Sequence, residues 1–355
     1  MLSLQRSFER ASQTAAELPR IPQLEPLYHN QDMHIHKGDL VMIAGRSGSQ
    51  KSGLAMFITA MLNQPALYIS GDMTPWEAST RIISLNTQHT TTQIQQNIDD
   101  YGPEYYRDSI HHGAHITFSF QSPITWTDIT MELQAYMEMW NTFPPLIVID
   151  NLMDIQDCES DYQAQQEAMQ WITALGRDTG STIIVTHHAT DKTGTDIEHP
   201  PARREIKNGL SEKPQLILGV SLYGGEDNGN GLSIPAEARI AVLKQRTGKS
   251  SPDGTRYERL RAYPEYTFFG PLAEKQPWNM TTTHKGLSCQ HNSHATAGQA
   301  QNGKHDYCTS YATPDTISNA STSTAAKTKA TSSSQPATKP TLSRRKPDNP
   351  TSPNS

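Results

Sequence analysis

The chain has 355 residues, of which 35% are hydrophobic, and it carries a formal net charge of -6 at pH 7. No run approaches the roughly 18 apolar residues of a membrane span, the N-terminus lacks a signal-peptide core, and three cysteines suffice for neither a disulfide framework nor a metal cluster. These features exclude membrane and disulfide-rich secreted classes and predict a soluble, cytoplasmic protein that makes no membrane contact.

Residues 1–36 precede the first strand pattern and are expected to form an N-terminal arm. Within it, apolar residues at helical spacing predict a helix over residues 4–18. The helix would have a single apolar stripe, which favours docking on this chain or on a neighbouring subunit.

Residues 37–188 alternate short apolar runs with helical patterns, which predicts an α/β fold with a mainly parallel sheet and helices on its faces. The expected strands are residues 40–44, 66–70, 115–120, 146–150 and 182–186, and the expected helices are residues 52–62, 75–85, 128–140 and 162–177. Further strands are expected at residues 215–223, 238–245 and 257–262. From there the composition changes, and residues 278–355 are rich in Ser, Thr and Pro, which predicts a disordered tail.

The net charge is unevenly divided between body and tail. Residues 281–355 hold eight Lys or Arg against three Asp, so the tail carries +5 and residues 1–280 carry -11. An acidic body excludes a generally basic nucleic-acid coat, and any contact with nucleic acid must come from local patches.

A glycine- and serine-rich loop joins the first predicted strand to the first predicted helix, which is the context of a phosphate-binding P-loop. We expect its residues to bind ATP: Gly45, Arg46, Ser47, Gly48, Ser49, Gln50, Lys51 and Ser52. The ammonium of Lys51 would reach the β- and γ-phosphates, and the hydroxyl of Ser52 would hold Mg²⁺. Gln50 stands where the pattern has glycine, so it is expected to keep a negative φ and to point away from the nucleotide; a P-loop that has lost activity is the alternative.

Three other predicted strands end in residues suited to phosphate chemistry. Asp150 ends an apolar strand in the manner of a Walker B acid and would bind Mg²⁺ opposite Ser52. Asp72 could orient the water that attacks the γ-phosphate, although a plain turn-forming role is the alternative. Thr186 is followed by His187 and His188, of which one could sense the γ-phosphate. Residues 151, 154 and 157 are expected to be solvated loop groups.

The order of these motifs resembles the RecA-like motor domain of DnaB-type replicative helicases. The resemblance covers about residues 37–272, and its motifs are KGDLVMIAG before the P-loop, SGDM at 70–73, LIVIDNL at 146–152, VTHH at 185–188 and VLKQRTG at 242–248. It implies a RecA-like P-loop NTPase domain over residues 37–277, with C-terminal strands that end near residue 269, and a phage- or plasmid-encoded origin would fit. The family's N-terminal collar domain has no counterpart in the 36 residues before this domain.

The resemblance also implies roles for individual residues. Asp72 would replace the catalytic glutamate of the family, His187 its γ-phosphate-sensing glutamine, and Lys244 and Arg246 the fingers that act on the neighbouring subunit's nucleotide. A plain exposed strand end is the alternative for that pair. The loop after His188 would contact single-stranded DNA through a basic set made up of Lys192, Arg203, Arg204 and Lys207, for which a solvated surface loop is the alternative.

The expected function is therefore that of an ATP-hydrolysing DNA helicase in replication, assembled as a homo-oligomer, with a hexameric ring as the expected form. Single-stranded DNA, ATP and Mg²⁺ are the expected ligands, and replication proteins are candidate partners. Two alternatives remain open at this point. One is a RecA-like recombinase or recombination mediator, and the other is a DNA-binding assembly module that has lost ATPase activity.

Overall fold

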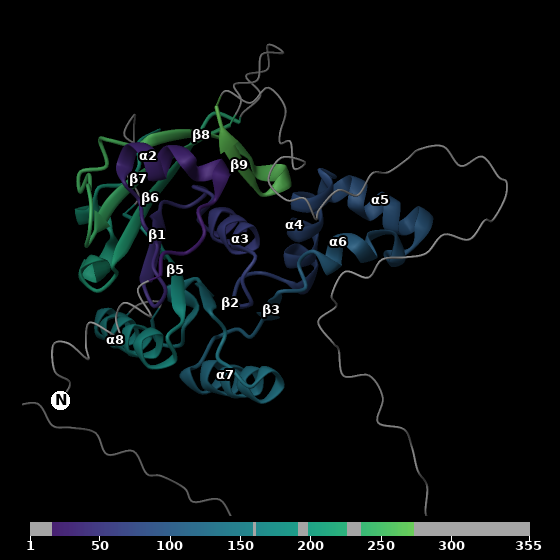
Figure 1. Ribbon diagram of the computed structural model, residues 1–355, viewed down its shortest axis with the longest axis horizontal. Coiled ribbons are helices and arrows are strands. Elements are labelled where there is room, and N and C mark those ends of the chain that lie inside the picture. The colour runs from purple at the N-terminus through teal and green to yellow at the C-terminus, as the bar shows by residue number, and fades with distance from the viewer. Residues whose placement is uncertain (1–15, 159–160, 191–197, 226–235, 273–355) are drawn as a thin grey trace, which may run out of the picture. The chain divides into compact units, whose positions relative to one another are not determined.

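The computed structural model describes residues 16–158, 161–190, 198–225 and 236–272 (Figure 1). In this part of the chain a single sheet has the strand order β3-β2-β4-β5-β1-β6-β7-β8-β9. The pairs from β3 to β6 are parallel, and the pairs from β6 to β9 are antiparallel. The strands are β1 (Leu40–Gly45), β2 (Ala66–Ser70), β3 (Ile116–Ser119), β4 (Leu146–Asp150), β5 (Thr182–His188), β6 (Leu216–Tyr223), β7 (Glu237–Gln245), β8 (Glu258–Tyr263) and β9 (Phe268–Pro271).

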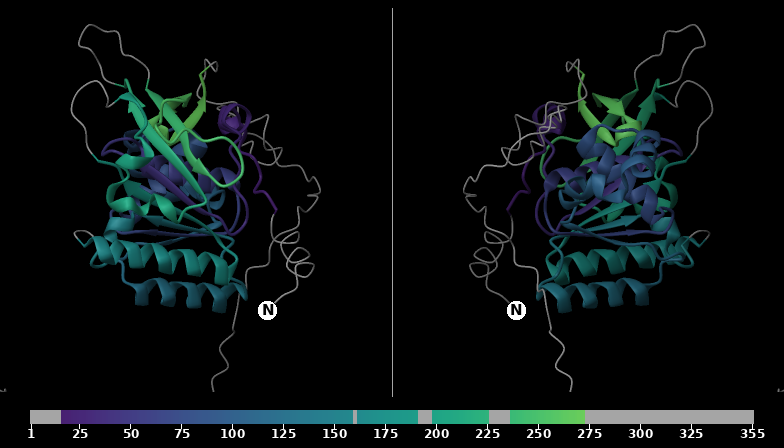
Figure 2. Two further views of the ribbon diagram at one scale, coloured as in Figure 1. Left: turned by 90° about the vertical axis from the view of Figure 1, so that its left-hand side faces the viewer. Right: turned by 90° about the vertical axis from the view of Figure 1, so that its right-hand side faces the viewer.

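Helices cover both faces of the sheet, and each face has its own apolar core. Helices α3 and α4 pack on one face, whereas α7 and α8 lie side by side on the other (Figure 2). The helices are α2 (Glu25–Gln31), α3 (Lys51–Leu62), α4 (Pro75–Thr87), α5 (Thr91–Tyr101), α6 (Arg107–His111), α7 (Trp126–Trp140) and α8 (Tyr162–Thr179). Short 3₁₀ turns are η1 (Pro22–Leu24), η2 (Pro103–Tyr106), η3 (Leu152–Asp154), η5 (Arg203–Glu205), η6 (Lys207–Glu212) and η7 (Pro264–Tyr266).

The α/β fold with a mainly parallel sheet and antiparallel C-terminal strands is confirmed. Among the described residues, no helix combines the length and the apolar character that crossing a membrane requires. Two helices, α5 and α6, had no counterpart in the sequence pattern. In α5 the only aliphatic residues are Ile94 and Ile98, in an otherwise polar stretch, and α6 has five residues of which none is buried, so both helices give a weak apolar signal in the sequence. The predicted tail lies outside the described residues.

Local capping sets the turns at the carboxyl edge of the parallel strands. The hydroxyl of Thr74 accepts the backbone N–H of Glu77, and the carboxylate of Glu77 accepts the backbone N–H of Thr74. This capping box begins α4 at Pro75 and leaves Asp72 in the turn after β2. Thr125 and Asp128 form the same arrangement at the start of α7.

The expected arm of residues 1–36 is described only from Ala16 onward, and this part packs into the core. Its apolar side chains, Leu18, Ile21, Leu24, Leu27, Tyr28, Met33 and Ile35, are buried among residues of α3, β7 and β9. The helix expected over residues 4–18 falls mostly outside the described residues, and Glu17 forms an extended bridge with His36. The boundary at residue 36 stays a prediction.

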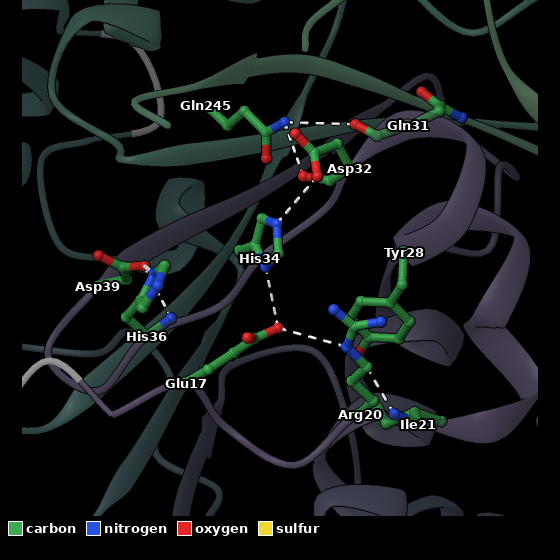
Figure 3. A network of polar contacts seen from close by, with 10 residues as sticks. All are labelled: Glu17, Arg20, Ile21, Tyr28, Gln31, Asp32, His34, His36, Asp39 and Gln245. Carbon is green, nitrogen blue, oxygen red and sulfur yellow. Dashed lines mark hydrogen bonds and ion pairs between the residues drawn. The ribbon is translucent and has the colours of Figure 1, made fainter. Parts of the chain in front are cut away.

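Polar contacts fasten this N-terminal segment at its surface (Figure 3). The His34 ring lies between two carboxylates, with Nδ1 3.0 Å from Glu17 Oε1 and Nε2 3.1 Å from Asp32 Oδ1. The hydrogen bond to Glu17, followed by that to Asp32, raises the pKa of His34. Close by, Gln245 Nε2 donates to the backbone oxygens of Gln31 and Asp32, which ties the segment to the end of β7.

Gln31 is the main link between the N-terminal segment and the sheet. Its side chain is fully buried, its Nε2 donates to Ile240 O at 3.0 Å, and its Oε1 accepts the N–H of Val242 at 2.8 Å. One amide side chain therefore provides the hydrogen-bond partners for one backbone acceptor and one backbone donor of β7. Both groups are buried, and the described neighbours would otherwise leave them without a partner.

We expect Gln31→Ala to lower the free energy of unfolding by about 2–4 kcal/mol, because two buried backbone groups lose their partners and a cavity remains. Urea denaturation followed by circular dichroism measures this change. The control His29→Ala removes an exposed side chain of the same helix and should leave the midpoint unchanged. Equal midpoints for the Gln31→Ala protein and the wild type would contradict the bridging role.

Candidate nucleotide-binding site

The P-loop lies between the carboxyl end of β1 and the start of α3, as the sequence predicts. Lys51 is buried, and its Nζ donates to Arg46 O at 2.9 Å across the loop. The same carbonyl accepts the hydroxyl of Ser49 at 2.7 Å. These contacts close the loop on itself. They hold the lysine ammonium near the backbone N–H groups of the loop and near the positive end of the α3 dipole.

Gln50 departs from the expectation made for it. Its φ is 64° and its ψ 32°, so the residue adopts the left-handed conformation that glycine would take there, and the expectation of a negative φ is wrong. The chain accommodates the side chain by a glycine three residues later: a Cβ on Gly53 would lie 2.7 Å from Gln50 Oε1. The side chain of Gln50 therefore packs against the first turn of α3.

Asp150 and Ser52 lie together at the carboxyl edge of the sheet. The Ser52 hydroxyl donates to Asp150 Oδ1 at 2.8 Å, the Thr186 hydroxyl donates to the same oxygen at 2.6 Å, and the Tyr68 hydroxyl donates to Oδ2 at 2.8 Å. The carboxylate is 3% exposed. Mg²⁺ prefers oxygen ligands, and in nucleotide sites it is bound by one or two protein side chains and the phosphates. The hydroxyl of Ser52 and the carboxylate of Asp150, beside the P-loop, therefore fit the predicted metal.

Asp72 belongs to a second group of polar side chains at the same edge. The side-chain amide of Asn151 donates to Asp72 Oδ2 at 3.2 Å, and the backbone N–H of Asn151 donates to Asp154 Oδ2 at 3.0 Å. These residues line a cavity of about 440 Å³ together with His188. Asp72 itself is exposed at the mouth of the site.

Asn151 and Asp154 are not the solvated loop groups that the sequence suggested. Asn151 is 8% exposed, and Asp154 packs so closely on the turn after β2 that a Cβ at Gly71 would lie 2.7 Å from its own Cβ. Burial, with the neighbouring charges of Asp72 and Asp150, raises the pKa of Asp154 from 3.8 to about 6. A polar residue after a strand looks the same in the sequence whether or not another segment covers it. Asp157 is exposed, as expected.

The two adjacent histidines of β5 face opposite sides of the sheet. Thr186 bonds to Asp150, so strand alternation directs His187 to the other face and His188 back toward the cavity with Asp72. His187 is fully buried, and burial lowers its pKa to about 4 despite the nearby backbone of Lys207. The structure thus brings His188, rather than His187, to the site edge, and the sensing role assigned to His187 stays a prediction.

Lys244 and Arg246 lie far from the P-loop of the same chain. Gln245 pairs with Leu216, which is level with Val41 at the start of β1, whereas the P-loop follows Gly45 at the end of β1. Four residues of strand correspond to about 13 Å, and the two basic residues lie toward the edge of the sheet opposite the P-loop.

The two residues differ in their surroundings. Lys244 Nζ donates to the backbone oxygens of Ser211 and Glu212, at 3.0 and 2.6 Å. Burial, followed by the charges of Arg203 and Arg246, lowers the pKa of Lys244 to about 8. Arg246 is exposed, so it is the member of the pair that is accessible to a neighbouring molecule.

Three of the four residues of the predicted basic set are described, and Lys192 lies outside the described residues. Arg204 and Lys207 are exposed, whereas the guanidinium of Arg203 donates to Ser211 Oγ and O. Arg203 and Arg204 line a cavity of about 450 Å³ between the turns η5 and η6 and the loop after β7. Of the described members, Arg204 and Lys207 are thus exposed basic residues, and Arg203 and Arg204 border this cavity.

Protonation of Asp154 gives the site a pH-dependent stability. Because its pKa is higher in the folded protein than in the unfolded chain, its stabilising contribution is complete below pH 4 and is lost as the pH rises through 6. We expect Asp154→Asn to remove this loss, so that the variant gains about 1–2 kcal/mol on the wild type between pH 4.5 and 8. Urea denaturation across this pH range measures the gain. Asp157→Asn is the exposed control, and parallel pH profiles for Asp154→Asn and wild type would contradict the assignment.

The chain is similar to known proteins both in sequence and in fold. The chain is 27% identical over 236 residues to the Gene 65 protein of Mycobacterium phage L5, which covers 64% of this chain and 84% of that protein. The fold of this chain is similar to that of a DnaB-like replicative helicase, whose structure was solved together with a study of that helicase's interactions with primase. The TM-score is 0.56, the sequences are 15% identical, and the match covers 76% of this chain and 68% of that one. It is equally similar to a second solved structure, that of an ATPase domain, with a TM-score of 0.56, 14% identity and coverage of 76% and 97%.

The sequence profile of the AAA domain matches residues 4–194, more than half of the chain. This span includes the P-loop, the Walker B strand and both histidines of β5. The protein therefore belongs to the AAA domain family and has the RecA-like fold of DnaB-like helicase ATPase domains.

Proposed function

We propose that this protein is an oligomeric ATP hydrolase that moves along single-stranded DNA, as a replicative helicase does. The observation that carries the proposal is the separation of its basic strand end from its own P-loop. Arg246 is exposed at the edge of the sheet opposite Lys51, so in a ring or filament it would serve the nucleotide of the adjacent subunit.

Within one subunit, different described residues would bind the phosphates, hold the metal and activate the attacking water. Lys51 would leave Arg46 O and neutralise the β- and γ-phosphates, and Ser52 and Asp150 would hold Mg²⁺. When bound, Mg²⁺ would supply positive charge that stabilises the phosphate oxygens of the ADP leaving group. Asp72, held by the amide of Asn151, would accept a proton from the attacking water at its free carboxylate oxygen.

A guanidinium supplied by a neighbour would complete the site. Charge develops on the phosphoryl oxygens during transfer, and a preorganised arginine beside them stabilises it without reorganising water. Hydrolysis would then depend on contact between subunits. The exposed set of Arg204 and Lys207, with Lys192 and Arg203, would bind DNA phosphates.

Mixing two inactive variants tests the division of the site between subunits. Lys51→Ala should abolish ATP hydrolysis, and Arg246→Ala should reduce kcat by about a thousandfold. A mixture of the two should regain activity, because an Arg246→Ala subunit keeps an intact P-loop that a Lys51→Ala neighbour can complete. Steady-state phosphate release measures this recovery.

Lys249→Ala is the matched control, since Lys249 is an exposed basic residue in the same loop. It should hydrolyse ATP like the wild type. Activity retained in both single variants would exclude the mechanism. A wild type that hydrolyses ATP, forms long filaments and fails to unwind a forked duplex would point to the strand-exchange alternative, and one that binds no ATP would point to an assembly module.

The salt dependence of binding tests the DNA surface. We expect the affinity for fluorescent oligonucleotides to fall steeply with salt, and Arg204→Ala and Lys207→Ala each to reduce the log–log slope by about 1. Lys213→Ala removes an exposed lysine outside the predicted set and should leave the slope unchanged. Identical slopes in all three variants would contradict the placement of DNA on this surface.

A further inference from the structure

One segment of the chain connects the P-loop to the basic strand end. This bridging segment, residues 198–212, contains the turns η5 and η6 and follows a part of the chain outside the described residues. Ala189, just after β5, pairs with Ile206 within it. The segment therefore passes beside the carboxyl edge of the sheet before it continues to the start of β6.

The side chain of Arg46 binds the P-loop to the bridging segment by an ion pair and a hydrogen bond. Arg46 Nη2 lies 2.9 Å from Glu205 Oε2, and Nη1 donates to His199 O at 2.9 Å. The arginine and glutamate side chains are 8% and 10% exposed, so both charges of this ion pair are removed from water. Removing charged side chains from water is unfavourable unless they pair with each other. The buried Arg46–Glu205 ion pair therefore favours one defined arrangement of the P-loop and the bridging segment.

Nucleotide binding would act directly on the backbone of the same arginine. Arg46 O accepts both the Lys51 ammonium and the Ser49 hydroxyl. A phosphate that takes the lysine removes one of these bonds from Arg46, in the residue whose side chain holds Glu205. The state of the loop and the position of the segment therefore share one residue.

The C-terminal end of the bridging segment contacts Lys244, one of the two residues predicted to act on a neighbouring subunit. The backbone oxygens of Ser211 and Glu212 bind Lys244 Nζ, two residues before Arg246. Arg203 donates to Ser211 from within the segment. Between the two ends lie the exposed Arg204 and Lys207.

We propose that Glu205 is a positioning residue that transmits the nucleotide state of the P-loop to the bridging segment, and through it to the DNA surface and to the strand end at Lys244. The inference rests on the proposed function, because it assumes that the P-loop binds ATP. It adds a residue that the motifs do not include. Its carboxylate would act through the guanidinium of Arg46, which it contacts at 2.9 Å.

Hydrogen–deuterium exchange on the full chain tests the proposal with a non-hydrolysable ATP analogue and Mg²⁺. In the wild type, analogue binding should change the exchange of amides in residues 203–212 by about tenfold. In Glu205→Gln, which keeps the shape but loses the charge, this response should disappear while the affinity for the analogue stays within about twofold. Glu198→Gln is the matched control, since Glu198 lies in the same segment but pairs with Arg239 and is 48% exposed.

The outcomes separate the inference from the proposed function. If the wild type does not bind the analogue, the proposed function fails. If it binds and the segment does not respond, or responds equally in Glu205→Gln, the positioning role of Glu205 is overturned. Stimulation of ATP hydrolysis by single-stranded DNA gives a second readout, and it should fall about tenfold in Glu205→Gln with basal hydrolysis retained. Equal stimulation in the variant and the wild type would also overturn the role.

Discussion

The buried carboxylate of Asp150 is the constraint around which the site is organised. A carboxylate that is 3% exposed is stable only with hydrogen-bond donors, and the chain supplies three hydroxyls from three elements. Ser52 comes from α3, Tyr68 from β2 and Thr186 from β5. Satisfying one charge thereby fixes the P-loop helix against two strands, and the phosphate-binding end of the molecule is preorganised.

Most of the sheet and the centre of the site could be predicted from the sequence, because both depend on local patterns. Apolar runs separated by amphipathic stretches identify the parallel strands. The carboxyl ends of such strands meet at one edge, so the closeness of Ser52 and Asp150 follows from their positions after two different strands. The capping box at Thr74 is equally local, and it located the turn that carries Asp72.

The features that could not be predicted depend on contacts between distant parts of the chain. Asn151 is buried and Asp154 is half-buried because the turn after β2 packs against them, and no pattern near residue 151 records that contact. Gln50 adopts a left-handed conformation because the sheet and α3 require that turn, and Gly53 provides the space. The alternation of β5 from Thr186 was a usable signal: it directs His188, and not His187, toward Asp72.

The place of Gln31 in the fold has a consequence for how the protein folds during synthesis. Its partners in β7 lie 209 and 211 residues later in the chain. At translation rates of about 5–20 residues per second, the N-terminal segment waits about 10–40 s for the strand that covers it. During that interval Leu24, Leu27 and Met33, all fully buried in the finished protein, have no permanent partner in β7. These apolar residues are thus synthesised well before the strand that covers them, and their native contacts with β7 form only after that strand has left the ribosome.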